Sequence, residues 1–247
     1  MKSFSCGLIA LVVAFASSAQ AQSFETKEQN KIPDHAFVPV GFDSNDNSQI
    51  VISGFYPNGC HKMGPTFFTV DKTNKKIVIE DKELFASGAI CTMQIQPYKK
   101  VINIGLLNAG DYTITAKGEN EEEVVKNNIN VSLAQPNAPQ DAELYADVYD
   151  LESKLTDDGA TELKIRGFLT NTCMKLDRVR AEIQDGNVLL IVPTVTLEGQ
   201  DCERTEIRFS KVVKARLSDK LHLVHVRANN GQSLNEIIQN GSIVHTY

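Results

Sequence analysis

Short runs of alternating apolar and polar residues, separated by turn residues, recur along most of the chain. Two pairs of such runs flank tight polar turns, Asp71-Lys72-Thr73-Asn74 and Gln184-Asp185-Gly186-Asn187. Alternation with period two predicts strands with one buried face, and polar turns between such runs predict hairpins. About seven short strands are expected within residues 34–133 and a similar number within 142–247, which is typical of β-sandwiches. The pattern therefore predicts an all-β chain.

The same pattern sets expected boundaries after the second cysteine of each half. Residues 91–96 are expected as a strand, with a turn centred on Pro97 before the next one. In the second half, residues 202–209 and 212–217 are expected as two separate strands.

Two other segments carry their own local signals. Residues 22–33 are polar and poor in apolar side chains, which predicts a flexible leader. Ser233 and Glu236 have the spacing of a capping box, which predicts a two-turn helix.

An internal repeat organises the chain. The sequence of residues 54–62, GFYPNGCHK, is matched in register by GFLTNTCMK at residues 167–175. The next cysteine follows at similar spacing, because 91 − 60 = 31 and 202 − 173 = 29. Two copies of this unit predict two tandem β-sandwich domains, at 34–133 and 142–247. The proline-containing segment 134–141 is expected to be a linker, so we expect each domain to be stable alone.

One strand resembles a known family. Residues 109–115, AGDYTIT, resemble the A-G-x-Y-T-[VI]-T strand near the end of secreted bacterial immunoglobulin-like domains. The resemblance implies an immunoglobulin-like β-sandwich, a fold that hosts unrelated functions. The second copy has KLHL at residues 220–223 instead. The cysteines also depart from the antibody pattern, because they join the loop after the second strand to the fifth strand and no Trp lies between them.

The N-terminus predicts export. Residues 1–21 combine Lys2, an apolar run and the sequence Ala19-Gln20-Ala21, which are features of a signal peptide. The apolar run is too short to span a bilayer, and no later run is long enough. We therefore expect a periplasmic or secreted protein without a transmembrane segment.

Four cysteines follow the signal peptide, an even number that predicts disulfides in an exported chain. Of the three possible pairings, only Cys60 with Cys91 and Cys173 with Cys202 respects the repeat.

Charge and motifs exclude several classes of function. The formal net charge is −6 and no basic stripe is present, which argues against nucleic acid and anionic membranes as partners. No recognised catalytic motif or phosphate-binding loop occurs, so we expect no enzyme activity and no cofactor. The cluster Cys60-His61-Lys62-Met63 would suit a soft metal only with a free thiolate. His222 and His225 are expected on opposite faces of a strand, so no metal site is expected.

The loop at residues 57–65 around Cys60 is the best candidate for recognition. Its glycines and prolines are expected to let Tyr56, His61 and Met63 face outward. The candidate binding residues are Tyr56, Asn58, His61 and Met63. The other interpretation is that the loop only carries the disulfide.

Three functions remain open. The first is an exported, non-enzymatic binding or interaction module for a protein or glycan partner at the cell envelope. The second is a secreted inhibitor of a hydrolase that acts through residues 57–65. The third is an envelope enzyme with dispersed catalytic residues.

Overall fold

The computed structural model describes residues 25–135, 144–185 and 187–246. Within these ranges the chain is built of β-strands and one short 3-10 helix, Asn229–Gly231. No helix in the described part is long and apolar enough to cross a membrane. The expected signal peptide at 1–21 and most of the expected linker at 134–141 lie outside the described residues.

Within residues 25–135 the first half contains nine strands, with the following bounds: β1 (Glu25–Asn30), β2 (His35–Phe37), β3 (Phe42–Asp43), β4 (Ser48–Tyr56), β5 (His61–Asp71), β6 (Lys76–Ser87), β7 (Gln96–Gly105), β8 (Gly110–Lys117) and β9 (Glu123–Ser132).

The second half contains the other nine described strands, with these bounds: β10 (Leu144–Tyr145), β11 (Asp147–Leu155), β12 (Thr161–Asn171), β13 (Met174–Gln184), β14 (Val188–Leu197), β15 (Arg204–Ala215), β16 (His222–Arg227), β17 (Ser233–Gln239) and β18 (Ser242–Ile243).

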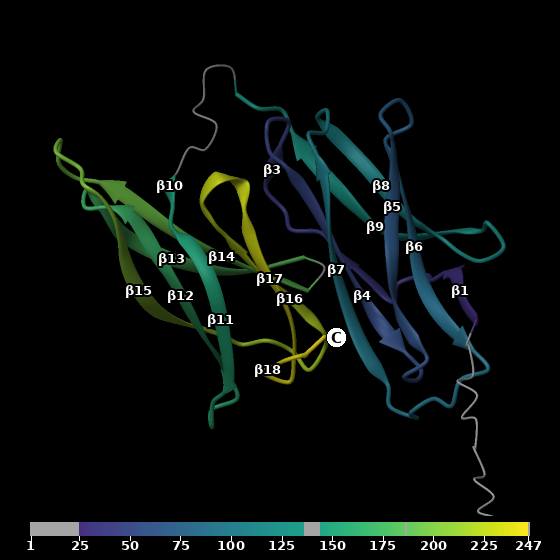
Figure 1. Cartoon of the computed structure of the whole chain (residues 1–247). Helices are drawn as coiled ribbons and strands as arrows, with labels where there is room; N and C mark the ends of the chain where they lie inside the picture. Colours follow the sequence, from purple (N-terminus) through teal and green to yellow (C-terminus); the bar gives the residue numbers. More distant parts are fainter. Residues whose placement is uncertain (1–24, 136–143, 186, 247) are drawn as a thin grey trace, which may run out of the picture.

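The two halves share one topology. The first half has a three-stranded sheet in the order β2-β4-β7 and a six-stranded sheet in which β6 pairs with β1, β5 and β8. The second half repeats this with β11-β12-β15 and with β14 paired to β10, β13 and β16. The β6–β8 and β14–β16 pairs are both parallel. Each half is therefore a β-sandwich, and the repeat predicted from the sequence is confirmed in three dimensions (Figure 1).

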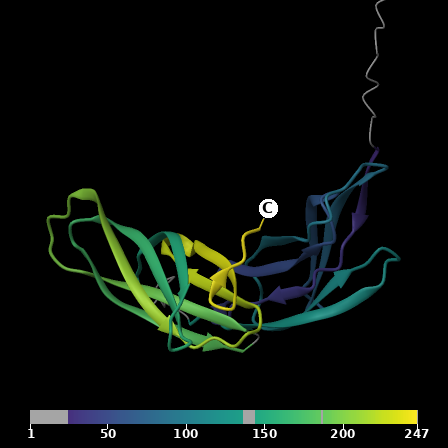
Figure 2. The same cartoon turned by 90° about the horizontal axis from the view of Figure 1, so that it is seen from below.

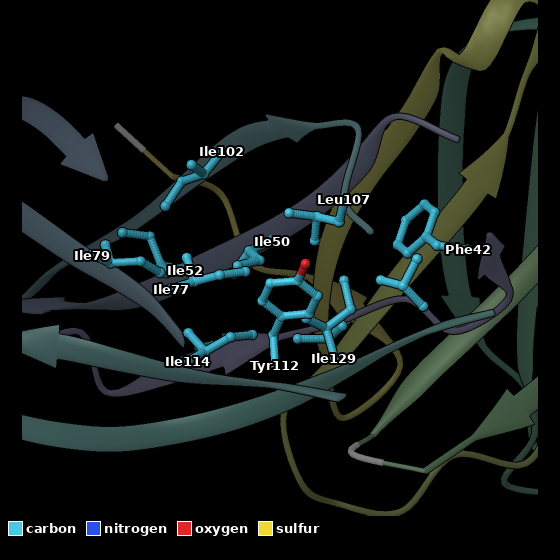
Figure 3. Close-up of a cluster of buried hydrophobic side chains, with 13 residues drawn as sticks. Phe42, Ile50, Ile52, Ile77, Ile79, Ile102, Leu107, Tyr112, Ile114 and Ile129 are labelled. Atoms are coloured by element: carbon cyan, nitrogen blue, oxygen red, sulfur yellow. The ribbon is translucent and has the colours of Figure 1, made fainter. Parts of the chain in front are cut away.

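Alternating side chains fill the core of the first half. Ile50 and Ile52 of β4 lie opposite Ile77 and Ile79 of β6 in one buried cluster, which Tyr112 of β8 joins (Figure 3). Burying each large apolar side chain contributes about 1.5–3 kcal/mol to folding. The strand motif at residues 109–115 thus supplies part of the core, as its alternation predicts. The second half has an equivalent core.

Both predicted disulfides are present, Cys60–Cys91 and Cys173–Cys202. In each half the bond joins the loop before β5 or β13 to the loop after β6 or β14.

Several predicted boundaries are wrong. Residues 91–95 form no strand; β7 begins at Gln96 and contains Pro97. Because β7 is an edge strand of its sheet, Pro97 removes no ladder hydrogen bond that a neighbour needs. Residues 204–215 form the single strand β15 rather than two strands.

The predictions of a flexible leader and of a short helix are also wrong, because both segments pair into sheets. Residues 25–30 of the expected leader form β1, which pairs antiparallel with β6 over six positions. Backbone hydrogen bonds do not need apolar side chains, so a polar segment can add to a sheet edge. Residues 233–239 form the strand β17 and not a helix, because pairing with β16 outweighs the local capping signal.

An apolar interface joins the two halves, which lie side by side in both views (Figures 1 and 2). Phe37 and Val51 of the first half share one buried cluster with Val188, Leu223 and Ile237 of the second half. The outer face of the first three-stranded sheet therefore packs against the outer face of the second six-stranded sheet.

Polar contacts flank this interface. The Lys99 ammonium lies 2.7 Å from a Glu236 carboxylate oxygen and 2.5 Å from the Asn235 carbonyl oxygen. The Ser233 hydroxyl donates to the Gln49 side-chain oxygen at 2.6 Å. The interface thus has the apolar centre and polar rim of a specific contact.

Candidate functional site: the first disulfide loop

The loop between β6 and β7, residues 88–95, is fixed at its middle; we call it the apolar loop. Cys91 is bonded to Cys60, and the next residue, Thr92, accepts a hydrogen bond at its carbonyl oxygen from the backbone N–H of Gly59 at 2.9 Å. A Cβ atom on Gly59 would lie 2.2 Å from the Thr92 hydroxyl oxygen, so a larger residue at position 59 would require the Thr92 side chain to move. The two segments are therefore locked together.

Three large apolar side chains project from this loop on either side of the anchored residues. Ile90 is 100% exposed, Met93 is 89% exposed and Ile95 is 63% exposed. Single exposed apolar residues are ordinary, but three within six positions form a local apolar surface. Because the disulfide already orders the loop, little conformational entropy remains to be lost when it binds.

The second half provides a built-in comparison. Aligning Cys91 with Cys202 places Asp201, Arg204 and Glu206 where the first half has Ile90, Met93 and Ile95. All three charged residues are exposed. The fold therefore tolerates charge at these positions, and the apolar residues of the first half are not required by the sandwich.

A cluster of aromatic rings lies in the interior next to the same disulfide. Tyr56 stacks on Tyr98 with ring centroids 4.6 Å apart and on His61 at 6.1 Å. Tyr56 and Tyr98 are both buried. This packing fixes the end of β4 that leads into Cys60.

Two buried carboxylates of β6 complete the cluster. Asp81 accepts a hydrogen bond from Thr66 at 2.7 Å and pairs with the Lys100 ammonium at 2.5 Å. Glu83 lies 3.2 Å from the His61 Nδ1 atom and accepts a hydrogen bond from Gln29.

Burial dominates the titration of this cluster. It raises the pKa of the Asp81 carboxyl, while hydrogen bonds from Lys100 and Thr66 oppose the shift. It also raises the pKa values of Tyr56 and Tyr98, and the nearby Asp81 charge adds to both shifts. Both phenols therefore stay protonated at neutral pH.

The second half fills the equivalent space with apolar residues. Leu169, Met174 and Val195 form a buried cluster against which Phe209 packs. By the repeat register these residues replace Tyr56, His61, Glu83 and Tyr98, in that order. The polar cluster is therefore a distinct feature of the first half. It carries a desolvation penalty that the apolar packing of the second half avoids.

The structure separates the four residues predicted for binding. Tyr56 is only 2% exposed and His61 is largely covered, so the expectation that they face outward is wrong. Tyr56 continues the inward alternation of Ile50 and Ile52 along β4. Asn58 uses its side-chain oxygen to accept the Cys60 backbone N–H at 2.9 Å, and therefore shapes the turn. Met63 is exposed.

The apolar loop itself was missed from the sequence. The sequence pattern predicts a strand over residues 91–96, whereas Met93 and Ile95 lie in the loop before β7. The signal that could have found the loop is the contrast between the two copies at the second cysteine, where Ile90 corresponds to Asp201.

The two histidines of β16 are buried and have separate partners. His222 lies 2.9 Å from the Ser218 hydroxyl, and the His225 Nδ1 atom lies 2.7 Å from the Asn235 side-chain oxygen. Both faces of β16 are covered, so both histidines are buried although they are three residues apart. Within the described residues, no three His, Cys, Asp or Glu side chains are placed to hold a metal ion.

A small half-open pocket lies at the junction of the two halves beside His225, Arg227 and Gln49. Its volume is about 50 Å³. This is room for about three or four water molecules.

The comparison with protein-family models agrees with the architecture of the first half. The sequence model of the ORF11 beta-sandwich domain matches residues 50–134, which run from β4 to the end of β9 and just beyond. The first half is similar to that domain. No curated protein and no solved structure matches the chain.

Proposed function

We propose that this protein is an exported, non-enzymatic binding module that docks on a protein partner through the apolar loop. The observation that carries the proposal is the exposure of Ile90, Met93 and Ile95 on a disulfide-anchored loop whose counterpart in the second half is charged. Apolar anchors on a rigid loop are typical of the energetic centre of a protein interface.

The chemistry of the loop favours a protein over the other partners. Ile and Met side chains offer no strong hydrogen-bonding groups to glycan hydroxyls, which would lose water without compensation. The net charge of −6 disfavours an anionic membrane surface. A groove lined by apolar side chains on another protein meets neither objection, because such side chains present no hydroxyl groups to desolvate and no negative charge.

Export is supported by the cysteines. Two disulfides, one in each half, are typical of chains that fold in an oxidising compartment. The expected signal peptide at residues 1–21 agrees with this, so we expect the partner at the cell envelope or outside it.

A secreted inhibitor is a second candidate, because an exposed loop that is fixed before binding is also suited to blocking an active site. The inhibitory element would then be the apolar loop and not residues 57–65, because Asn58 and the preceding Tyr56 have structural roles. Stoichiometric loss of a hydrolase's activity on addition of the protein would favour this version of the proposal.

The test is site-specific photo-crosslinking in an envelope extract. A photoreactive amino acid at position 90 or 93 is expected to give one discrete protein adduct. The same amino acid at position 201 or 204, the matched positions of the second half, is expected to give none.

The triple variant I90D/M93R/I95E carries the residues of the second half and should weaken binding to the captured partner at least about tenfold. Its melting temperature should stay close to that of the wild type, since these side chains are exposed. Val212→Arg, an equally drastic change at an exposed apolar residue of β15, serves as the control. Equal adducts from both halves, or wild-type binding by the triple variant, would refute the proposal.

A further inference from the structure

Strand β5 has a free edge. It pairs antiparallel with β6 along one side, and among the described residues no strand pairs with its other side. Figure 1 shows β4 and β7 between β5 and the strands of the second half. No residue of β5 belongs to the apolar cluster that joins the two halves.

This edge lacks the charges that usually protect a free strand. Residues 63–70 contain no charged side chain, and Phe67 and Phe68 are 55% and 37% exposed. The equivalent strand β13 has charges at five positions: Lys175, Asp177, Arg178, Arg180 and Glu182. Charged residues on an edge strand discourage pairing with another chain, and β5 has none over this stretch.

The usable part of the edge is short and has a defined centre. At one end, a register shift between Met63 and Thr66 breaks the ladder, and the Lys100 ammonium binds the Gly64 carbonyl oxygen at 2.9 Å. At the other end, the Asp71 side chain accepts hydrogen bonds from the turn that follows. The free segment therefore runs from residue 66 to residue 70, and Phe68 is its midpoint.

We propose that β5 pairs antiparallel with β5 of a second copy of this chain, about a two-fold axis at Phe68. In this register Phe68 faces Phe68 of the second copy, Phe67 faces Thr69, and Thr66 faces Val70. Aromatic and β-branched cross-strand pairs of this kind stabilise antiparallel sheets, and no charge is placed opposite a like charge. The contact is self-complementary, as a two-fold interface requires.

The dimer does not depend on the apolar loop, which lies outside the pairing segment. It would carry two such loops, so a partner with two binding sites would be held more tightly than by one copy.

The first test measures association of the purified full chain by sedimentation velocity over about a hundredfold range of concentration. The wild type is expected to shift from monomer to dimer. F67K/T69K places Lys opposite Lys across the two-fold axis and should weaken the dimer at least about tenfold. F67K/T69E changes the same two positions but places Lys opposite Glu, and should retain the dimer.

A second measurement tests the same register without the charged variants, in case those variants do not fold. Phe68→Cys brings two cysteines directly opposite each other, at a Cα separation that a disulfide can span. It should give a covalent dimer on mild oxidation, whereas Thr69→Cys, whose copies lie diagonally, should not.

Four results would overturn the proposal. They are a wild type that stays monomeric throughout, a dimer unaffected by F67K/T69K, equal weakening by F67K/T69K and F67K/T69E, and loss of the dimer in I90D/M93R/I95E, which would place self-association at the loop.

Discussion

Tyr56 stacks on Tyr98 in the interior of the first half, with ring centroids 4.6 Å apart. The second half has Leu169 and Phe209 at the same two positions, so neither hydroxyl group is needed to fill the space. The Tyr56 hydroxyl oxygen is buried and makes no hydrogen bond to any described residue. The stack therefore contributes packing, while the Tyr56 hydroxyl carries an uncompensated desolvation cost.

Tyr56→Phe should therefore leave stability unchanged or raise it by about 1 kcal/mol, since it removes an unpaired polar atom and keeps the ring. Urea unfolding at neutral pH measures this. Tyr56→Ala is the contrasting variant and should cost about 3–5 kcal/mol, because it empties a buried site. A loss of more than 1 kcal/mol in Tyr56→Phe would show that the hydroxyl has a partner.

Much of each sandwich could be predicted from the repeat. Gly54 lies opposite Tyr98 in the β4–β7 pair, and Gly167 lies opposite Phe209 in the β12–β15 pair. A Cβ atom on either glycine would come within 3 Å of the facing ring. Both aromatic residues follow their cysteine by seven positions, since 98 − 91 = 209 − 202 = 7. The equal spacing in the two copies therefore corresponds to the same glycine–aromatic contact between strands in both halves.

The contact between the halves was not predicted, although the sequence contains a signal for it. Residues 50–52 and 188–192 are continuous apolar runs, whereas a strand with one solvated face alternates. Val51 and Val188 point away from their own sandwich cores and into the shared cluster. Periodicity identifies such a strand as buried on both faces but cannot say which surface covers it.

The shared cluster predicts that the two halves unfold together. Val51→Asp places an unpaired charge in the interface and should split one calorimetric transition into two, because Val51 belongs to neither core. Ile50→Asp, one residue away but inside the core of the first half, should unfold that half outright. After proteolytic cutting within residues 135–140, the two pieces are expected to remain associated. Separation of the cut pieces on gel filtration would instead support independent domains.

The two disulfides should contribute equally to the stability of the protein, but only Cys60–Cys91 should contribute to partner binding. Their sequence separations of 31 and 29 residues give similar loop-closure entropies. C60A/C91A and C173A/C202A should each lower the free energy of unfolding by about 3.5 kcal/mol. Only C60A/C91A should weaken partner binding, because it releases the apolar loop. Binding titrations at a temperature where both variants are folded make the comparison, and equal loss of affinity would place recognition elsewhere.

The buried His225 should make stability depend on pH. Burial lowers its pKa from 6.5 to about 4, and the charge of Arg227 adds to the shift. Asn235 donates to the Ser233 hydroxyl through its amide nitrogen, so its side-chain oxygen accepts the proton on His225 Nδ1. The folded protein therefore holds His225 neutral over a pH range in which the unfolded chain binds a proton.

This contribution to stability is complete above pH 6.5 and is lost as the pH falls toward about 4. A shift of this size corresponds to about 3 kcal/mol of lost stability between pH 7 and pH 4. His225→Asn keeps a donor near the position of Nδ1 but cannot titrate, so its stability should fall by about 3 kcal/mol less than that of the wild type over the same interval. His222, whose pKa is also lowered by burial, is present in both proteins and cancels from the difference. Chemical denaturation at the two pH values measures it, and equal losses in the two proteins would mean that His225 is protonated in the folded state.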